Sequence, residues 1–162
     1  MKQLCSAIYI TACLAALAGC DPGFVYVIPG APSMLDNGQR YVVNVGGGVE
    51  ARFHASVFTS SGTVHVQVIN QSEDAIQFRF APPEITFGAG RPVHEKRCEQ
   101  HYAEDAIPIP RGKTIEVSCR FVVTEIEPGG YSSDYRSLHV ELPGFSRNGA
   151  PLKIAATMQG KF

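Results

Sequence analysis

Apolar and polar residues alternate one by one through most of the chain from Arg40 onward. In the stretch 49–57 the odd positions are Val, Ala, Phe, Ala and Val, and the even positions are Glu, Arg, His and Ser. Successive side chains of a β-strand point to opposite faces of a sheet, so this period of two predicts a strand with one buried face. The pattern therefore limits this part of the chain to sheets that pack through one apolar face.

The same alternation recurs in short runs that polar or glycine-rich turns separate. The runs cover residues 41–45, 64–68, 76–80, 85–87, 114–123, 138–142 and 152–158. The turns include the pair Asn148-Gly149, which is a typical hairpin signal. We expect the runs 64–68 and 76–80 to pair as a hairpin. Seven or eight short antiparallel strands predict an all-β fold, built as a two-sheet sandwich.

The first 19 residues differ in composition from the rest. Lys2 supplies a positive charge, the run from Ala7 to Ala18 is apolar, and small residues precede Cys20. This order is typical of a secretory signal peptide, and the apolar run is too short for a membrane span. The sequence thus predicts a signal peptide at 1–19, a tether at 20–38 rich in proline and glycine, and a β-sandwich domain at 39–162.

The residues Leu17-Ala18-Gly19-Cys20 resemble the lipobox of bacterial lipoproteins. The resemblance implies cleavage before Cys20, lipidation of its thiol and acylation of the new N-terminus. It also implies a membrane partner through this lipid, and a place in the cell envelope on the periplasmic side. Asp21 resembles the signal with which enteric bacteria retain lipoproteins in the inner membrane, so that membrane is preferred.

An apolar run from Phe24 to Ile28 interrupts the tether. An exposed apolar run of this size is unusual in a soluble domain. We therefore expect it to dock on the domain as a strand or an extended segment. The alternative is that it lies at the lipid surface.

The cysteines divide between the signal peptide and the domain. Cys5 and Cys13 lie in the signal peptide, and besides Cys20 only Cys98 and Cys119 remain. A pair of cysteines exported to an oxidising compartment predicts one disulfide. Closing a loop of this length would stabilise the domain by about 3 kcal/mol in the chain-entropy description.

The charge balance excludes one class of partner. Lys2 is the only charged residue before Cys20, so the chain from Cys20 on carries 13 Lys and Arg against 15 Asp and Glu, a net charge of −2. Nucleic-acid binding needs a clearly basic surface, so we expect no nucleic-acid partner. No later apolar run is long enough to span a bilayer, and no motif calls for a cofactor.

Two further segments, Val68 to Ser72 and Ile109 to Thr114, resemble parts of small immunoglobulin-like domains of bacterial envelope proteins. The resemblance covers residues 40–162 and implies an immunoglobulin-like sandwich. The family's core tryptophan is missing, since the chain has none. The fold by itself implies no particular function.

A metal site is the alternative interpretation of the segment around Cys98. His94, Cys98 and His101 are spaced four and three residues apart, so they would share one face of a helix. Imidazole and thiolate are ligands of zinc or copper. A disulfide at Cys98 would leave two histidines, which make a poor site.

Two of the remaining histidines lie on predicted neighbouring strands. His54 and His65 are both on polar faces, on either side of the turn at 60–62. Cross-strand pairing can bring them together. Solvated histidines on a strand face are the simpler interpretation.

Two long loops are the best candidates for a contact surface, because loops on a rigid sandwich are a common place for binding. Serine motifs of hydrolases are absent: Ser146 lacks the glycine two residues later that such a motif needs. We expect a membrane-anchored, non-catalytic lipoprotein for binding or envelope assembly, with metal delivery as the alternative. The candidate contact residues are Arg97, His101, Glu104, Tyr131 and Tyr135.

Overall fold

The structure, a computed structural model, describes residues 24–58, 61–88, 90–93, 95–99, 105–123 and 133–161. These residues form strands and one short 3₁₀ turn, which confirms the all-β prediction. The strands are β1 Phe24–Val27, β2 Ser33–Asp36, β3 Gln39–Gly46, β4 Val49–Phe58, β5 Ser61–Asn70, β6 Ile76–Phe78, β7 Glu84–Phe87, β8 Arg91–Pro92, β9 Lys96–Cys98, β10 Ile107–Ile109, β11 Thr114–Val122, β12 Ser137–Leu142, β13 Phe145–Arg147, β14 Ala150–Pro151 and β15 Ile154–Lys161, with the turn η1 at Ser133–Arg136.

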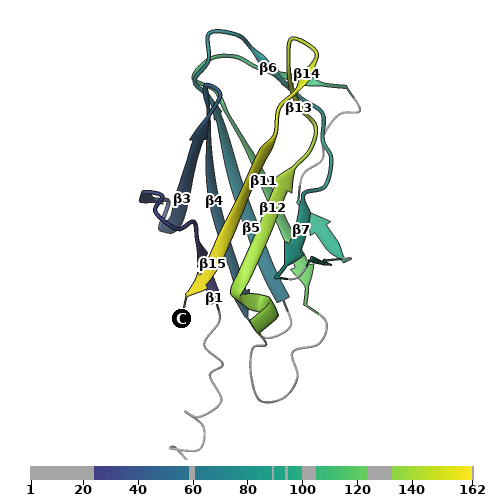
Figure 1. Cartoon of the computed structure of the whole chain (residues 1–162). Coiled ribbons are helices and arrows are strands. Elements are labelled where there is room, and N and C mark those ends of the chain that lie inside the picture. The colour runs from purple at the N-terminus through teal and green to yellow at the C-terminus, as the bar shows by residue number, and fades with distance from the viewer. Residues whose placement is uncertain are drawn as a thin grey trace, which may run out of the picture.

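The strands form two antiparallel sheets. The larger has the order β8-β7-β12-β15-β1-β4-β5-β11-β9, with β3 beside β4 and β2 beside β3. Its two halves face each other, and Figure 1 shows β12 and β15 in front of β4, β5 and β11. The smaller sheet, in the order β10-β6-β13-β14, lies at one end of the sandwich, at the top of Figure 1.

The core lies between the two halves, on the faces that the alternation predicts. The odd positions of β4 are buried from Val49 to Val57, and Phe53 is completely buried. Leu138 of β12 and Met158 of β15 close the same core from the other half. Burial of these apolar side chains is the main force that holds the halves together.

Strand β1 joins the two halves of the sandwich. Residues 25–27 pair with β15, and residues 24–26 pair with β4. Tyr26 is buried in the core, which confirms that the apolar run docks as a strand. The prolines and glycines predict a tether over residues 20–38, but its described part from residue 24 belongs largely to the sheet. The buried Tyr26 stabilises β1 in the sheet. The side chains of β2 are mostly exposed, and this strand is held by its pairing with β3.

The hairpin predicted between residues 64–68 and 76–80 is wrong. β5 pairs with β4 and β11, whereas β6 pairs with β10 and β13 in the smaller sheet. Asn70 stabilises the turn at which the chain changes sheets, because its buried amide donates to the carbonyls of Asp74 and Ile109 at 2.7 and 2.9 Å. These bonds satisfy two backbone carbonyl groups at the turn, which would otherwise need hydrogen-bond donors from a paired strand.

Candidate functional site

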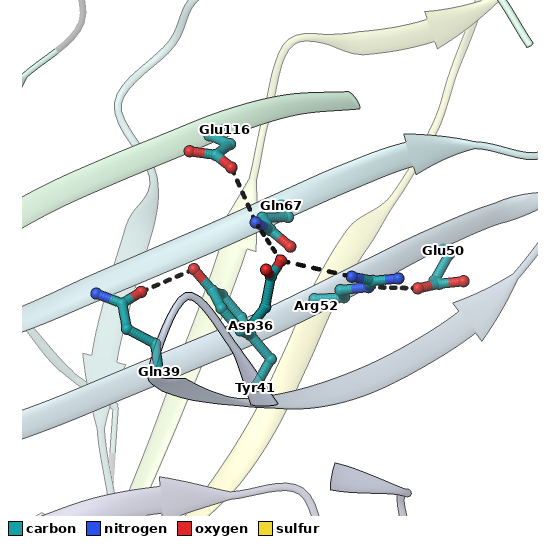
Figure 2. Close-up of polar contacts among 7 residues, drawn as sticks. All are labelled: Asp36, Gln39, Tyr41, Glu50, Arg52, Gln67 and Glu116. Atoms are coloured by element: carbon teal, nitrogen blue, oxygen red, sulfur yellow. Dashed lines mark hydrogen bonds and ion pairs between the residues drawn. The ribbon is translucent and has the colours of Figure 1, made fainter. Parts of the chain in front are cut away.

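A cluster of seven polar residues lies on the outer face of β4, β5 and β11, under the hairpin of β2 and β3. Asn37 and Gly38 connect these two strands with φ angles of 49° and 79°, the left-handed conformations of a tight hairpin turn. The hairpin brings its last β2 residue over the neighbouring strands. Figure 2 shows the cluster, which comprises Asp36, Gln39, Tyr41, Glu50, Arg52, Gln67 and Glu116.

Arg52 of β4 lies between two carboxylates. Its Nε donates to Oε1 of Glu50 at 2.5 Å, and its Nη1 is 3.7 Å from Oδ2 of Asp36. Glu50 and Arg52 are two residues apart on one strand, so they share its outer face. All three side chains are mostly buried, and their side-chain exposed fractions are 21% for Arg52, 19% for Glu50 and 31% for Asp36.

The amide of Gln67 on β5 connects the hairpin to β11. Gln67 is buried, and its Nε2 donates to Oδ2 of Asp36 at 3.0 Å and to Oε1 of Glu116 at 2.8 Å. The amide thus separates two carboxylates, as Figure 2 shows. Its Oε1 atom is buried and has no hydrogen-bond partner. A buried amide oxygen without a partner costs free energy, so this side chain is held for its two donated bonds.

Tyr41 of β3 completes the cluster. Its hydroxyl donates to Oε1 of Gln39 at 2.8 Å. Burial raises the pKa of Tyr41, and the carboxylates of Glu116 and Asp36 raise it further, while Arg52 acts against them. The phenol therefore stays protonated and remains a hydrogen-bond donor.

The formal charge of this cluster is negative, because it contains three carboxylates and one guanidinium. Its hydrogen bonds hold the β2–β3 hairpin on the sheet. What the cluster offers to another molecule is fixed negative charge and hydrogen-bond acceptors, which suit a basic partner surface.

The two histidines predicted to be neighbours are directly opposite each other, His54 on β4 and His65 on β5. His54 Nδ1 lies 2.7 Å from the carbonyl oxygen of Arg40, so this nitrogen carries the donated proton. His65 Nε2 lies 3.0 Å from the hydroxyl of Ser118. Burial lowers the pKa of His65, and His54 lowers it further. This pair is a hydrogen-bonded part of the polar face.

The predicted disulfide is confirmed. Cys98 and Cys119 are bonded and stand directly opposite each other on β9 and β11. The bond fixes the edge strand β9 to the sheet. The next pair along these strands places the exposed Arg97 opposite Arg120, so one predicted contact residue does lie on the surface.

The helical face that would join His94, Cys98 and His101 is not formed. Residues 96–98 are strand β9, in which such spacings do not bring side chains together. Cys98 is oxidised and supplies no thiolate, whereas His94 and His101 lie outside the described residues. Within the described ranges, no three His, Cys, Asp or Glu side chains are grouped as a metal site.

The prediction that Tyr135 offers an aromatic contact on a loop is wrong. Tyr135 lies in η1 and is 5% exposed, and its ring packs edge-on against Phe87 with centroids 5.0 Å apart. Apolar contact with the core has drawn this ring inward. The other predicted residues, Cys20, His101, Glu104 and Tyr131, lie outside the described part of the chain.

The polar cluster is the feature that the sequence analysis missed. Its signal is the series Asp36-Asn37-Gly38-Gln39, because Asn-Gly between two runs favours a two-residue hairpin turn. Once that hairpin is assumed, the polar faces of β4, β5 and β11 become neighbours of Asp36.

The sequence matches no protein-family model, and comparison with curated proteins finds no relative. Among the residues that the structure describes, no helix has the length and apolar character to cross a membrane.

Proposed function

We propose that the chain is a lipoprotein, anchored through a lipid on Cys20, whose β-sandwich is a non-catalytic binding or assembly module of the cell envelope on the periplasmic side. The signal-like residues 1–19 and the lipobox-like ending support export and lipidation. The Cys98–Cys119 disulfide supports an oxidising compartment. Asp21 favours the inner membrane.

The position of β1 is the observation that carries this proposal. Only three residues separate Cys20 from Phe24, where β1 begins. β1 pairs on both sides, with β15 and with β4. A lipid on Cys20 would therefore hold the body by a strand in the middle of the larger sheet. A chain end that is paired on both sides does not fray. The lipid would therefore be connected to the folded domain without a flexible strand between them.

The contact surface of the module would be the outer face of β4, β5, β11 and β9. Three carboxylates of the polar cluster and the exposed Arg97 lie on this half of the sandwich. Fixed charges of both signs favour an envelope protein with a complementary charged surface. The rigid sheet beneath them supplies a preorganised surface, which lowers the entropic cost of binding.

The anchor is tested by comparing Cys20→Ser with Cys13→Ser in cells given a traceable fatty acid. We expect the label and membrane retention in the wild-type chain and in Cys13→Ser, because Cys13 lies within the apolar run of the signal. Cys20→Ser should carry no label. Intact mass of the mature chain should start at Cys20. Equal labelling of both variants, or a mature chain that still begins at Met1, would refute the proposal.

The partner is tested by photo-crosslinking in living cells. A photoreactive residue replaces Glu116 in one chain and Lys153 in another. Glu116 is exposed on β11 within the polar cluster, and Lys153 is 74% exposed on the other half of the sandwich. We expect a discrete crosslinked protein from position 116 and none from position 153. Identical sets of adducts from both positions would argue against a specific contact surface on this face.

A further inference from the structure

Exposed apolar side chains gather at one end of the sandwich. Among the described residues, five large apolar side chains are exposed, and three of them are Val25, Phe58 and Val122, with exposed fractions of 37%, 54% and 42%. Phe58 ends β4, Val122 ends β11, and Val25 is the second residue of β1. These strand ends meet at the bottom of Figure 1, where β1 begins.

The three side chains lie on the same outer face. Phe58 and Val122 both stand opposite the exposed Ser61, one on either side of it. Val25 stands opposite Ser56, two residues before Phe58 on β4. Directly opposite residues in an antiparallel sheet point to the same side. The three therefore form one apolar margin at this end, which we call the basal margin.

Basic side chains lie one step further along the same face. Thr63 stands opposite Ser56 on one side and Arg120 on the other, and Arg120 stands opposite Arg97. Both arginines therefore lie in the row of Val25, next to the row of Phe58 and Val122. Two residues along a strand correspond to about 7 Å. Arg120 is exposed and only loosely paired, since its Nη2 is 3.6 Å from Glu99. Such surface pairs contribute little and exchange readily for other anions.

Two acidic residues lie beside this end among the described residues, as many as the arginines. Glu99 is the partner of Arg120, and Glu95 lies beside Val122, whose N–H donates to the Glu95 carbonyl at 3.1 Å. The two guanidinium groups stand opposite each other on neighbouring strands. Like charges directly opposite are unfavourable in isolation. A surface of phosphate groups would remove this repulsion.

We propose that the basal margin docks directly on an anionic lipid bilayer, with Phe58 and Val122 in the headgroup region and Arg97 and Arg120 at the level of the lipid phosphates. This inference rests on the proposed lipid on Cys20. Apolar side chains beside arginines are the pattern by which proteins bind lipid interfaces. The step of about 7 Å between the two rows is comparable to the depth of about 5–10 Å to which apolar faces are buried at the headgroup and acyl boundary.

The short connection to Cys20 selects the bilayer over other occupants. Four residue steps from Cys20 to Phe24 span at most about 14 Å. The end of the sheet that carries Phe24 therefore cannot leave the membrane surface while the lipid is inserted. Held this close, even a weak contact of three apolar side chains is populated, because the anchor sets a high effective concentration. The bilayer thus fixes the orientation of the body.

The test measures membrane depth at single positions in the acylated full chain. Phe58→Cys and Val122→Cys each carry an environment-sensitive fluorophore, in vesicles of phosphatidylglycerol and phosphatidylcholine. The control is Thr114→Cys, because Thr114 is exposed on the outer face of β11 at its other end. We expect emission shifted to the blue, and several-fold stronger quenching by spin-labelled lipid, at 58 and 122 but not at 114. Thermal unfolding confirms that each labelled chain is folded.

Each outcome separates docking from anchoring. A chain that intact mass shows to be acylated, but whose probes at 58 and 122 behave like the probe at 114, overturns the docking and leaves the anchor standing. A chain without acylation overturns both. Probes that respond in native membranes but not in pure lipid vesicles show that a protein covers the basal margin, which also overturns the lipid as its occupant.

The role of the arginines has its own readout. In the acylated chain labelled at position 58, we expect Arg97→Gln with Arg120→Gln to reduce the quenching several-fold in vesicles that contain phosphatidylglycerol. In vesicles of phosphatidylcholine alone the same change should have little effect. Equal quenching in both lipids and in both chains would show that the arginines do not bind lipid phosphate.

Discussion

The Tyr26 hydroxyl donates to the main-chain carbonyl of Tyr135 at 2.7 Å, in the interior of the protein. The two residues are 109 positions apart, so the bond ties β1 to the turn η1 that precedes β12. β1 also carries the connection to the proposed anchor. This hydrogen bond therefore helps to keep β1 in the sheet when a force acts on it through the proposed anchor.

We predict that Tyr26→Phe lowers the free energy of unfolding by about 1 kcal/mol, since it removes one buried hydrogen bond and leaves the carbonyl without this donor. The ring remains, so apolar burial is almost unchanged. Urea denaturation of the domain measures the difference. Tyr26→Leu, which also removes ring contacts with Phe87, should cost more. Equal stability of Tyr26→Phe and the wild type would mean that water replaces the bond.

The disulfide should stabilise the domain by about 3 kcal/mol, because it closes a loop with a sequence separation of 21 residues. We expect reductant to lower the urea midpoint of the wild-type chain. The variant with both Cys98→Ala and Cys119→Ala should have the lower midpoint already and show no response to reductant. If reductant also lowers the urea midpoint of the double variant, its effect does not come from the Cys98–Cys119 bond.

Stability should fall in mild acid partly through His65. Burial, aided by His54, lowers the pKa of His65 in the folded chain below its ordinary value of 6.5, while Glu116 and Glu99 oppose the shift. The unfolded chain then binds the proton more readily, so this stability is present above about pH 6.5 and is lost as the pH falls below it.

The variant His65→Gln tests this pH dependence. We expect the free energy of unfolding of the wild type, minus that of the variant, to be constant above neutral pH and to decrease toward pH 5. Urea titrations at several pH values give this difference, and they cancel the effects of carboxylates that both chains share. A difference that stays constant over the whole range would show that His65 does not titrate differently on folding.

The amide of Gln67 separates Asp36 from Glu116, so a carboxylate in its place should be strongly unfavourable. Gln67→Glu would bring three carboxylates together, and their repulsion raises the pKa of the new group. We expect the variant to be least stable near neutral pH and to recover toward about pH 4, where the new carboxyl is protonated and can donate a hydrogen bond.

Gln67→Met is the matched control for this position, because it keeps a side chain of similar size without charge. It should lose roughly 1–3 kcal/mol through the missing hydrogen bonds, with little pH dependence. The difference in stability between the two variants, measured at neutral and acid pH, isolates the repulsion. If the difference in stability between Gln67→Glu and Gln67→Met does not become smaller in acid, the three carboxylates are not close together.

The alternation along β4 and β11 is sufficient to predict their buried faces, because each strand has one face in the core over its whole length. The crossing at Asn70 is not predictable in the same way: a polar stretch after β5 looks like a hairpin turn, and only tertiary hydrogen bonds to Asp74 and Ile109 show that the chain changes sheets. Tyr135 is likewise a long-range case, since the core that buries it comes from distant strands.

Asp36 shows the same limit for the candidate site. Its partners Arg52, Gln67 and Glu116 come from three other strands, so no local spacing brings them together. The Cys98–Cys119 bond was predictable for a different reason, namely that the chain offers no other pair of cysteines beyond Cys20. A disulfide can be predicted when the sequence leaves only one pair of cysteines. A cluster whose members come from different strands cannot be predicted until the order of the strands is known.

Gly62 of β5 provides the space for the Phe121 ring on β11, the strand that ends in the basal margin. A Cβ at position 62 would lie 2.1 Å from Cζ of Phe121, and the two residues are directly opposite each other. The ring is held on its other side by Phe87, with centroids 5.9 Å apart. We expect Gly62→Ala to cost about 2 kcal/mol, because the buried ring cannot move without strain.

A double-mutant cycle distinguishes this contact from a backbone effect. Phe121→Leu alone should destabilise the domain through lost packing. Combined with Gly62→Ala, it should cost clearly less than the sum of the two changes, since the smaller side chain leaves room for the new methyl group. Urea denaturation of the four chains gives the coupling. Strict additivity would mean that Gly62 is needed for its backbone freedom rather than for the space it leaves to Phe121.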